Sequence, residues 1–143
     1  MRFWGIEPKV SLFVIPYALL AFYLNSKLPR HSLQLPSVGT VLLGVGVILW
    51  LLCYFQVSRA YSSGKLLTVG CYSKVRHPIY SIWGFLILPG FSLVIGGFML
   101  GLPFVYWLAV VKFIDEEEKA LEERFGDEWK NYARKRPRFL PRI

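Results

Sequence analysis

The sequence predicts an all-α integral membrane protein with about four transmembrane helices, the last two forming a tight helical hairpin, and a cytoplasmic amphipathic helical region at the C-terminus. Of the 143 residues, 55% are hydrophobic and only 18% are charged, whereas a soluble domain carries about 25% charged residues. The basic residues stand at the ends of long apolar runs, which is how membrane proteins place them. A chain of this length is expected to form one domain, 1–143.

The first two predicted spans are charge-free runs of ordinary length. Residues 10–26 contain no charge and make about 26 Å of helix, just long enough for a hydrocarbon core of about 30 Å. No small-residue cleavage site follows this run, so we expect a retained span and not a removed signal peptide. The second apolar run predicts a span at 38–56.

The third run is too long for one crossing. No residue from His77 to Val111 carries a formal charge, and as one helix these residues would measure about 52 Å. We therefore predict two spans, 78–95 and 98–114, joined by a very short turn. The residues that allow a bend or turn are Pro89-Gly90, Gly96-Gly97, Gly101 and Pro103.

The basic residues are distributed unevenly across the predicted membrane. With four spans, the N-terminus, the loop 57–77 and the tail 115–143 share one side and, together with Lys112 at the end of the fourth span, hold 15 of the 17 basic residues. Cytoplasmic segments are enriched in Lys and Arg. We therefore predict that the loop and the tail face the cytoplasm of a cell membrane or bacterial inner membrane, and that the polar chemistry lies there. The net charge of +8 is then explained by topology, and nucleic acid is not an expected partner.

The tail has the pattern of an amphipathic helix. Eight of the nine acidic residues lie within 115–128, and apolar residues recur among them every three or four positions. By itself this pattern is typical of a helix that rests its apolar stripe on the bilayer. Gly126 followed by Asp127 predicts a helix stop and a new N-cap, and Pro137 and Pro141 end the regular structure. The apolar stripe consists of Leu121, Phe125, Trp129 and Tyr132.

The two cysteines are too few for a disulfide framework, and neither lies in a Cys-x-x-Cys pair or at metal spacing from a histidine. Cys53 lies within an apolar run and Cys71 in a polar stretch, which predicts that they sit at different depths. We expect no zinc or other metal site.

Residues 76–80 bring polar side chains to the start of the third span. Proline is favoured in the first helical turn, so Pro78 predicts that His77 caps the helix beside unpaired N–H groups. Such an end suits an anion, for example a ligand carboxylate. Arg76 adds a cationic fork, and Tyr80 adds a ring and a hydroxyl. The alternative interpretation is a helix start with interfacial Arg and Tyr anchors.

Three glutamates, residues 116–118, follow the fourth span. One interpretation is that they are solvated and pair with Lys119 and Arg124 along the helix. The other follows from the hairpin, which returns this cluster to the level of His77. A carboxylate there would accept hydrogen bonds from ligand hydroxyls or hold a ligand ammonium.

Several separated motifs occur in one order within residues 64–141: Gly70-Cys71-Tyr72, then Arg76-His77-Pro78-Ile79-Tyr80, then Glu117-Glu118-x-x-Leu121-x-x-x-Phe125-Gly126-x-x-Trp129-x-x-Tyr132, and finally Pro137-Arg138-Phe139-Leu140-Pro141. Together they resemble the C-terminal signature of the isoprenylcysteine carboxyl methyltransferases. The related phospholipid N-methyltransferases share the broader pattern.

The resemblance implies a membrane-embedded methyltransferase that uses S-adenosylmethionine and has no Rossmann domain. The acceptor is expected to be a lipophilic small molecule or a lipidated substrate reached from the membrane lipids, first of all a prenylcysteine-like molecule methylated on its carboxylate. His77 would suit the amino-acid carboxylate of the cofactor, and Glu117 its ribose hydroxyls or ammonium. The positions that match cofactor-binding residues of the family are Leu66, Leu67, Tyr72, His77, Tyr80 and Glu117.

One position departs from the family pattern. These methyltransferases usually carry an arginine four residues before the first glutamate of the pair, where it orients the substrate carboxylate, and this position is Phe113 here. We expect Lys112 to bind the substrate or Arg76 to orient it in place of the missing arginine. Otherwise the acceptor is not a prenylcysteine carboxylate.

Three alternative functions follow from the same residues. The first is methylation of a phospholipid or of another amine or thiol, which would need a base to remove a proton. The second is an NADPH-dependent reductase of the sterol-reductase type, in which residues 134–136 would meet the 2′-phosphate. The third is a small non-enzymatic membrane adaptor whose charged tail docks a partner. The sequence does not specify the oligomeric state.

Overall fold

The computed structural model describes residues 7–27 and 34–140, and all structural statements below concern these residues. They contain no strand, which confirms the all-α class. Four helices are long and apolar enough to cross a membrane, Pro8–Asn25, Pro36–Ser62, Pro78–Ile95 and Gly97–Phe125, which confirms the four predicted spans. The α-helices are α1 (Glu7–Asn25), α2 (Pro36–Ser62), α3 (Pro78–Ile82), α4 (Leu88–Ile95), α5 (Leu102–Phe125) and α6 (Asp127–Lys135).

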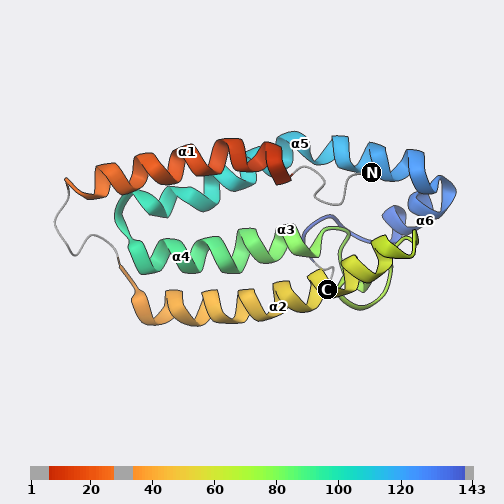
Figure 1. Ribbon diagram of the computed structural model, residues 1–143, viewed down its shortest axis with the longest axis horizontal. Coiled ribbons are helices and arrows are strands. Elements are labelled where there is room, and N and C mark those ends of the chain that lie inside the picture. Colours follow the sequence, from red (N-terminus) through yellow and green to blue (C-terminus); the bar gives the residue numbers. More distant parts are fainter. Residues whose placement is uncertain (1–6, 28–33, 141–143) are drawn as a thin grey trace.

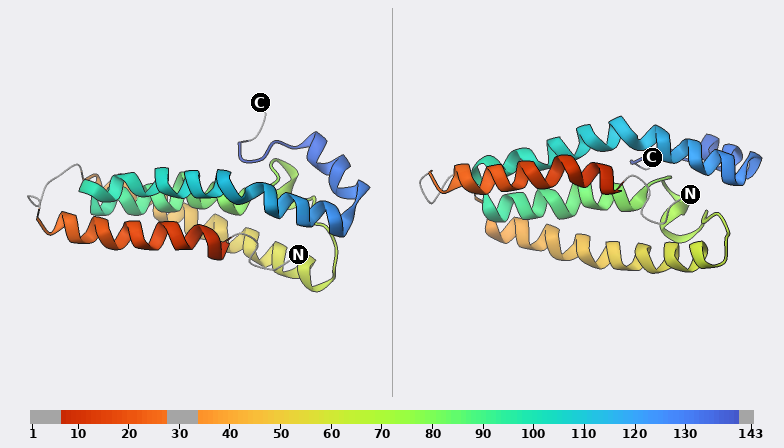
Figure 2. Two further views of the ribbon diagram at one scale, coloured as in Figure 1. Left: turned by 90° about the horizontal axis from the view of Figure 1, so that it is seen from above. Right: turned by 45° about the horizontal axis from the view of Figure 1, so that its top comes forward.

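The long helices lie side by side along the long axis of the molecule (Figures 1 and 2). Helix α1 packs against α5, and α2 packs against α4. The end of α2, the loop after it, the end of α5 and helix α6 gather at one end of the bundle (Figure 1). The loop and the tail, which were predicted to lie on the same side of the membrane, therefore meet in the structure.

The second and fourth helices are longer than predicted. Helix α2 continues to Ser62 instead of residue 56, and α5 runs unbroken to Phe125 instead of ending at 114. The charges that begin at Lys112 mark a limit of the apolar segment, but residues 115–125 are good helix formers and do not interrupt the helix. The stop occurs at Gly126, as predicted, because glycine adopts its positive φ of 59° without strain. The rigid α5 therefore carries the glutamates directly from the membrane span.

The turn between the last two spans is the predicted one, with one addition. Gly96 and Gly97 take positive φ angles of 76° and 61°, and a short 3₁₀ turn, Gly97–Gly101, precedes α5. Asn25 of α1 closes this turn: its amide donates to the Gly96 carbonyl at 3.1 Å and accepts from the Phe98 N–H at 2.8 Å.

The third span is not one regular helix, contrary to the prediction. A π-helical segment, η2 (Trp83–Ile87), separates α3 from α4. The Leu88 N–H bonds to the Trp83 carbonyl, five residues back. The Gly84 carbonyl instead accepts a hydrogen bond from the Trp107 indole of α5 at 3.0 Å. A side chain at Gly84 would overlap this indole, so glycine is required where the two spans meet.

The prediction that the two cysteines lie at different depths is wrong, because Cys53 and Cys71 form a disulfide. The apolar character of helix α2 hid the fact that the loop folds back along it: Gln56 Oε1 accepts a hydrogen bond from the Cys71 N–H at 3.0 Å. Disulfides persist in oxidising compartments, whereas the distribution of basic residues predicts that this end of the bundle faces the cytoplasm. The two indicators of orientation therefore disagree.

Candidate functional site

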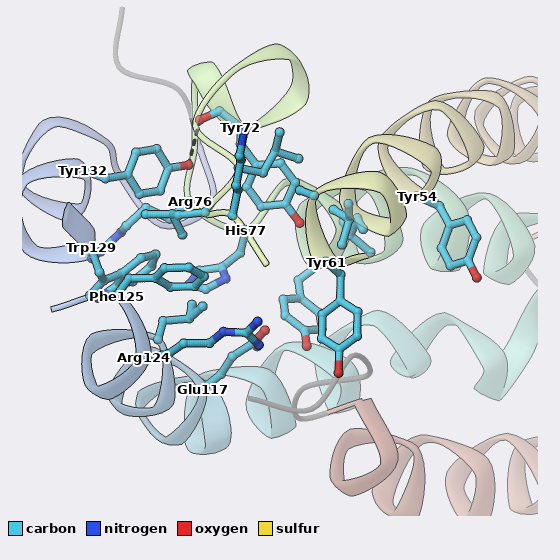
Figure 3. A pocket seen from close by; sticks show the side chains of 18 of the residues that line it. Tyr54, Tyr61, Tyr72, Arg76, His77, Glu117, Arg124, Phe125, Trp129 and Tyr132 are labelled. Atoms are coloured by element: carbon cyan, nitrogen blue, oxygen red, sulfur yellow. Dashed lines mark hydrogen bonds between the residues drawn. The ribbon is translucent and has the colours of Figure 1, made fainter. Parts of the chain in front are cut away.

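A pocket opens at the end of the bundle where the loop and the tail meet (Figure 3). Its walls come from the second half of α2, the loop after it, the start of α3, the outer part of α5, and α6. About 1040 Å³ of empty space lies within it, the open mouth included.

The structure brings most of the predicted site residues to this pocket. All six predicted cofactor-binding residues line it, and so does Arg76. Lys112 does not line it: its ammonium lies 5.5 Å from the ring centres of Phe13 and Phe113, where α5 packs on α1. Of the two cations expected to replace the family arginine, the structure therefore places only Arg76 at the pocket. Residues 134–136 do not line it either.

The start of α3 is closed by the C-terminal segment 136–140, here called the C-terminal strap. The N–H groups of Arg76 and His77 donate to the carbonyls of Pro137 and Arg138 at 2.8 and 3.0 Å. Pro78 begins α3 and His77 precedes it, as predicted, but the helix has only five residues and no side-chain cap. The strap therefore occupies the N–H groups of Arg76 and His77, and an anion beside the N–H groups of the first turn of α3 stays a prediction.

The strap is fixed by further contacts. Its Phe139 ring lies between His77 and Trp107, with ring centres 5.9 and 4.9 Å away. The Phe139 carbonyl accepts a hydrogen bond from the Ser81 hydroxyl at 2.7 Å. Pro137 in the strap predicted an end of regular structure, and Pro141 lies outside the described residues. The return of the strap to residues 76–81 was not visible in the sequence.

Glu118 is the centre of a cluster of two arginines and a histidine. Its carboxylate lies 2.9 Å from His77 Nε2, 3.0 Å from Arg138 Nη2 and 3.4 Å from Arg76 Nη1. The Glu118 side chain is only 13% exposed, so it is not a solvated residue of the helix surface. Because a carboxylate only accepts hydrogen bonds, the proton of this pair belongs on Nε2. The other ring nitrogen, Nδ1, is left outside this pair.

Glu117, one residue earlier on α5, faces the pocket instead. The Tyr80 hydroxyl hydrogen-bonds to its carboxylate. Its second oxygen, Oε2, is buried and has no hydrogen-bond partner among the described residues, and the same holds for Nε of Arg76. Buried polar atoms are normally paired. These two atoms therefore fit a polar ligand, with Glu117 accepting from ligand hydroxyls or an ammonium.

The apolar stripe of the tail packs inward. Leu121, Trp129 and Tyr132 are buried and pack against Leu66 and Tyr72 of the loop. The interpretation that this stripe rests on the bilayer is therefore wrong: it forms one wall of the pocket.

Two tyrosines tie the tail to the loop. The Tyr132 hydroxyl lies 2.7 Å from the Tyr72 carbonyl and 3.0 Å from the Val75 carbonyl (Figure 3). Burial raises the pKa of Tyr132 to about 12. Burial also raises the pKa of Tyr72, and the nearby charge of Glu117 adds to this shift. Both phenols therefore stay neutral and can donate hydrogen bonds at physiological pH.

The sequence analysis missed several lining residues. Trp50, Tyr54, Val57 and Tyr61 line the pocket from α2. Their spacing of four, three and four residues places them on one helix face, which was a usable signal within the apolar run. Arg124 lines the pocket from α5 and was assigned only to surface ion pairs. The pocket thus extends from polar groups at α5 to an aromatic face of a membrane-spanning helix.

Comparison with curated proteins finds a relative with a similar sequence. The chain is 36% identical over 92 residues to the Protein-S-isoprenylcysteine O-methyltransferase of Schizosaccharomyces pombe. The match covers 63% of this chain and 39% of the relative, so the chain spans well under two thirds of that protein. No protein-family model matches the chain, and no solved structure does. The similarity confirms the resemblance to the isoprenylcysteine carboxyl methyltransferases that the motifs indicate.

Proposed function

We propose that this chain is a membrane methyltransferase that uses S-adenosylmethionine to methylate a lipophilic acceptor, with carboxyl O-methylation of a prenylcysteine-like molecule as the reaction. The observation that carries the proposal is the buried, unpaired Oε2 of Glu117 inside a pocket lined by all six positions that match the family. The name of the yeast relative supports the same chemistry.

Different residues of the pocket would bind different parts of the cofactor. Glu117 accepts hydrogen bonds from ribose hydroxyls or from the ammonium. Leu66, Leu67 and the ring of Tyr72 border the adenine, and aromatic faces in the wall tolerate a sulfonium cation. When bound, the cofactor would supply an electrophilic methyl group for transfer to the acceptor oxygen, with a neutral thioether as its leaving group.

A carboxylate acceptor suits the state of His77. A carboxylate is already ionised at pH 7 and needs no base, whereas an amine or a thiol must first lose a proton. His77 Nε2 is paired with Glu118, so His77 would act as a base only through Nδ1, and Tyr72 and Tyr132 stay protonated. Orientation of the two reactants and exclusion of water then supply most of the rate.

The aromatic face of α2 explains why the site belongs to a membrane protein. Trp50 and Tyr54 line the pocket from within a span, so the apolar part of an acceptor can remain at bilayer depth while its polar end reaches Glu117. We place this end of the bundle on the cytoplasmic side, as the distribution of basic residues indicates.

The test is calorimetric titration of S-adenosylmethionine into the purified protein in mild detergent. We expect saturable binding by the wild type and at least about ten-fold weaker binding by Glu117→Ala, because a hydrogen bond to a charged group contributes about 1.5–3 kcal/mol. Glu123→Ala is the matched control, since Glu123 is exposed on the same helix and does not line the pocket.

Two results would refute the proposal. One is a folded wild-type protein that does not bind S-adenosylmethionine, and saturable binding of NADPH by that sample would favour the reductase alternative. The other is equal weakening by Glu117→Ala and Glu123→Ala, because the site would then lie elsewhere. Formation of a base-labile methyl ester on N-acetyl-S-farnesyl-L-cysteine tests the acceptor class separately.

A further inference from the structure

Arg124 stands at the mouth of the pocket with an unusual environment for a surface arginine. Its guanidinium lies 5.7 Å from the ring centre of Tyr61 on α2 and 5.4 Å from that of Phe125. Its Nη2 lies 3.9 Å from the position that a Cβ would occupy at Gly64, in the turn after α2. The Arg124 side chain thus lies near two rings and the turn, and it extends from α5 toward α2. Figure 3 shows Arg124 and Glu117 extending from α5 toward the same space.

The charge of Arg124 is not neutralised by a carboxylate within the described part of the chain. The ion pairs near it use Asp115, Glu116, Glu118 and Glu122 with other cations. The reason is local: the residues three and four positions before Arg124 are Leu121 and Ala120. The helix ends at Phe125, so Glu128 is not the neighbour that an unbroken helix would bring to it.

The other guanidinium of the pocket and its imidazole are paired with a carboxylate. Arg76 and His77 both contact Glu118, and their N–H groups are bonded to the C-terminal strap. These pairings reduce the share of Arg76 and His77 that is open to a ligand carboxylate. Arg124 is the guanidinium that lines the pocket without a carboxylate partner among the described residues, and exposed Lys65 lines the same wall.

We propose that Arg124 is the carboxylate-binding residue of this pocket. A guanidinium that lies near two rings still presents a planar fork, which matches a carboxylate with two parallel hydrogen bonds. This inference rests on the proposed function for the identity of the ligand, since both the cofactor and a prenylcysteine acceptor carry one carboxylate.

The experiment compares ligands that differ only in that carboxylate. Two pairs are titrated into wild type and Arg124→Gln in mild detergent, with tryptophan fluorescence as the readout, because Trp50 and Trp129 line the pocket. One pair is S-adenosylmethionine and its decarboxylated form. The other is N-acetyl-S-farnesyl-L-cysteine and its carboxamide. Lys119→Gln removes the same charge from an exposed position on α5 that does not line this pocket.

The expected result is that wild type prefers the carboxylate in one pair by about ten-fold, and that Arg124→Gln abolishes this preference while Lys119→Gln keeps it. Arg124→Lys should recover part of it, since it keeps the charge but loses the fork. The ligand pair whose preference is lost in Arg124→Gln identifies the molecule that supplies the bound carboxylate. Loss of preference in the cofactor pair assigns Arg124 to the cofactor, and loss in the acceptor pair assigns it to the acceptor.

Three outcomes would overturn the inference: a wild type that prefers neither carboxylate, an Arg124→Gln variant that keeps the preference, or equal loss in Lys119→Gln. These outcomes differ from failure of the proposed function. A protein that binds S-adenosylmethionine but shows no role for Arg124 refutes only the inference. A protein that binds no S-adenosylmethionine yet loses its preference for the acceptor carboxylate in Arg124→Gln refutes only the cofactor assignment.

Discussion

Glu118→Gln should destabilise the protein more than Asp115→Asn, because the Glu118 side chain is largely buried and that of Asp115 is exposed. Glu118 and Asp115 both pair with Arg138, at 3.0 and 2.7 Å, but their side chains are 13% and 70% exposed. Breaking a buried ion pair by removing one partner costs about 3–5 kcal/mol, whereas exposed pairs contribute about 0–1 kcal/mol. If the distance to Arg138 alone set the energy, loss of the Asp115 charge would be the more destabilising change.

The magnitude follows from the surroundings of Glu118. The substitution leaves His77, which is 4% exposed, and Arg76, which is 17% exposed, without their anion. Glutamine keeps the shape and one acceptor, and Arg138 is 38% exposed. We therefore expect Glu118→Gln to lower the free energy of unfolding by about 2–3 kcal/mol, and Asp115→Asn by less than about 1 kcal/mol.

The assay is unfolding in mixed micelles of a mild detergent and SDS, followed by tryptophan fluorescence. Trp129 reports on this region, because its ring centre lies 6.4 Å from that of His77. S-adenosylmethionine binding is measured on the same samples, and we expect Glu118→Gln to weaken it because His77 and Arg76 line the pocket. Equal destabilisation by Glu118→Gln and Asp115→Asn would refute the reasoning, since burial would then not set the energy.

Two further predictions concern the supports of the site. Gly84→Ala should lower the free energy of unfolding by about 1–3 kcal/mol through overpacking against Trp107. Gly44→Ala should not, because nothing lies within 4 Å of the new Cβ there. Thermal melting in detergent compares the two variants, and equal losses of stability would contradict the packing argument. Opening the Cys53–Cys71 bond, which spans 18 residues, should cost about 3 kcal/mol by its effect on the unfolded chain. A reductant should therefore lower the melting temperature of wild type but not of Cys71→Ser, and an equal drop in both would show that the bond is not the cause.

The resemblance predicted the composition of the site better than the local physics of its residues did. Glu117 and His77 were placed at one site by motif order and by the hairpin, and the pocket does join them. The resemblance singled out Glu117, whereas the local pattern did not separate it from Glu118, because only the packing shows that Glu118 meets two arginines and His77 while Glu117 keeps a free oxygen. Lys112 was a reasonable substitute by proximity in sequence, yet it lies on the α1 side of α5.

The sequence by itself determined the features that depend on the chain's own solvent preference and local backbone. Runs without charge require helices in a bilayer because every backbone polar group must be paired there, and Gly126 ends α5 through its own φ. The tertiary structure alone decided the return of the strap to His77, the disulfide, the π segment beside Trp107 and the unpaired Arg124. Each depends on contacts between residues far apart in the sequence, and such contacts leave no periodic pattern because the partner of a side chain is set by how the helices pack.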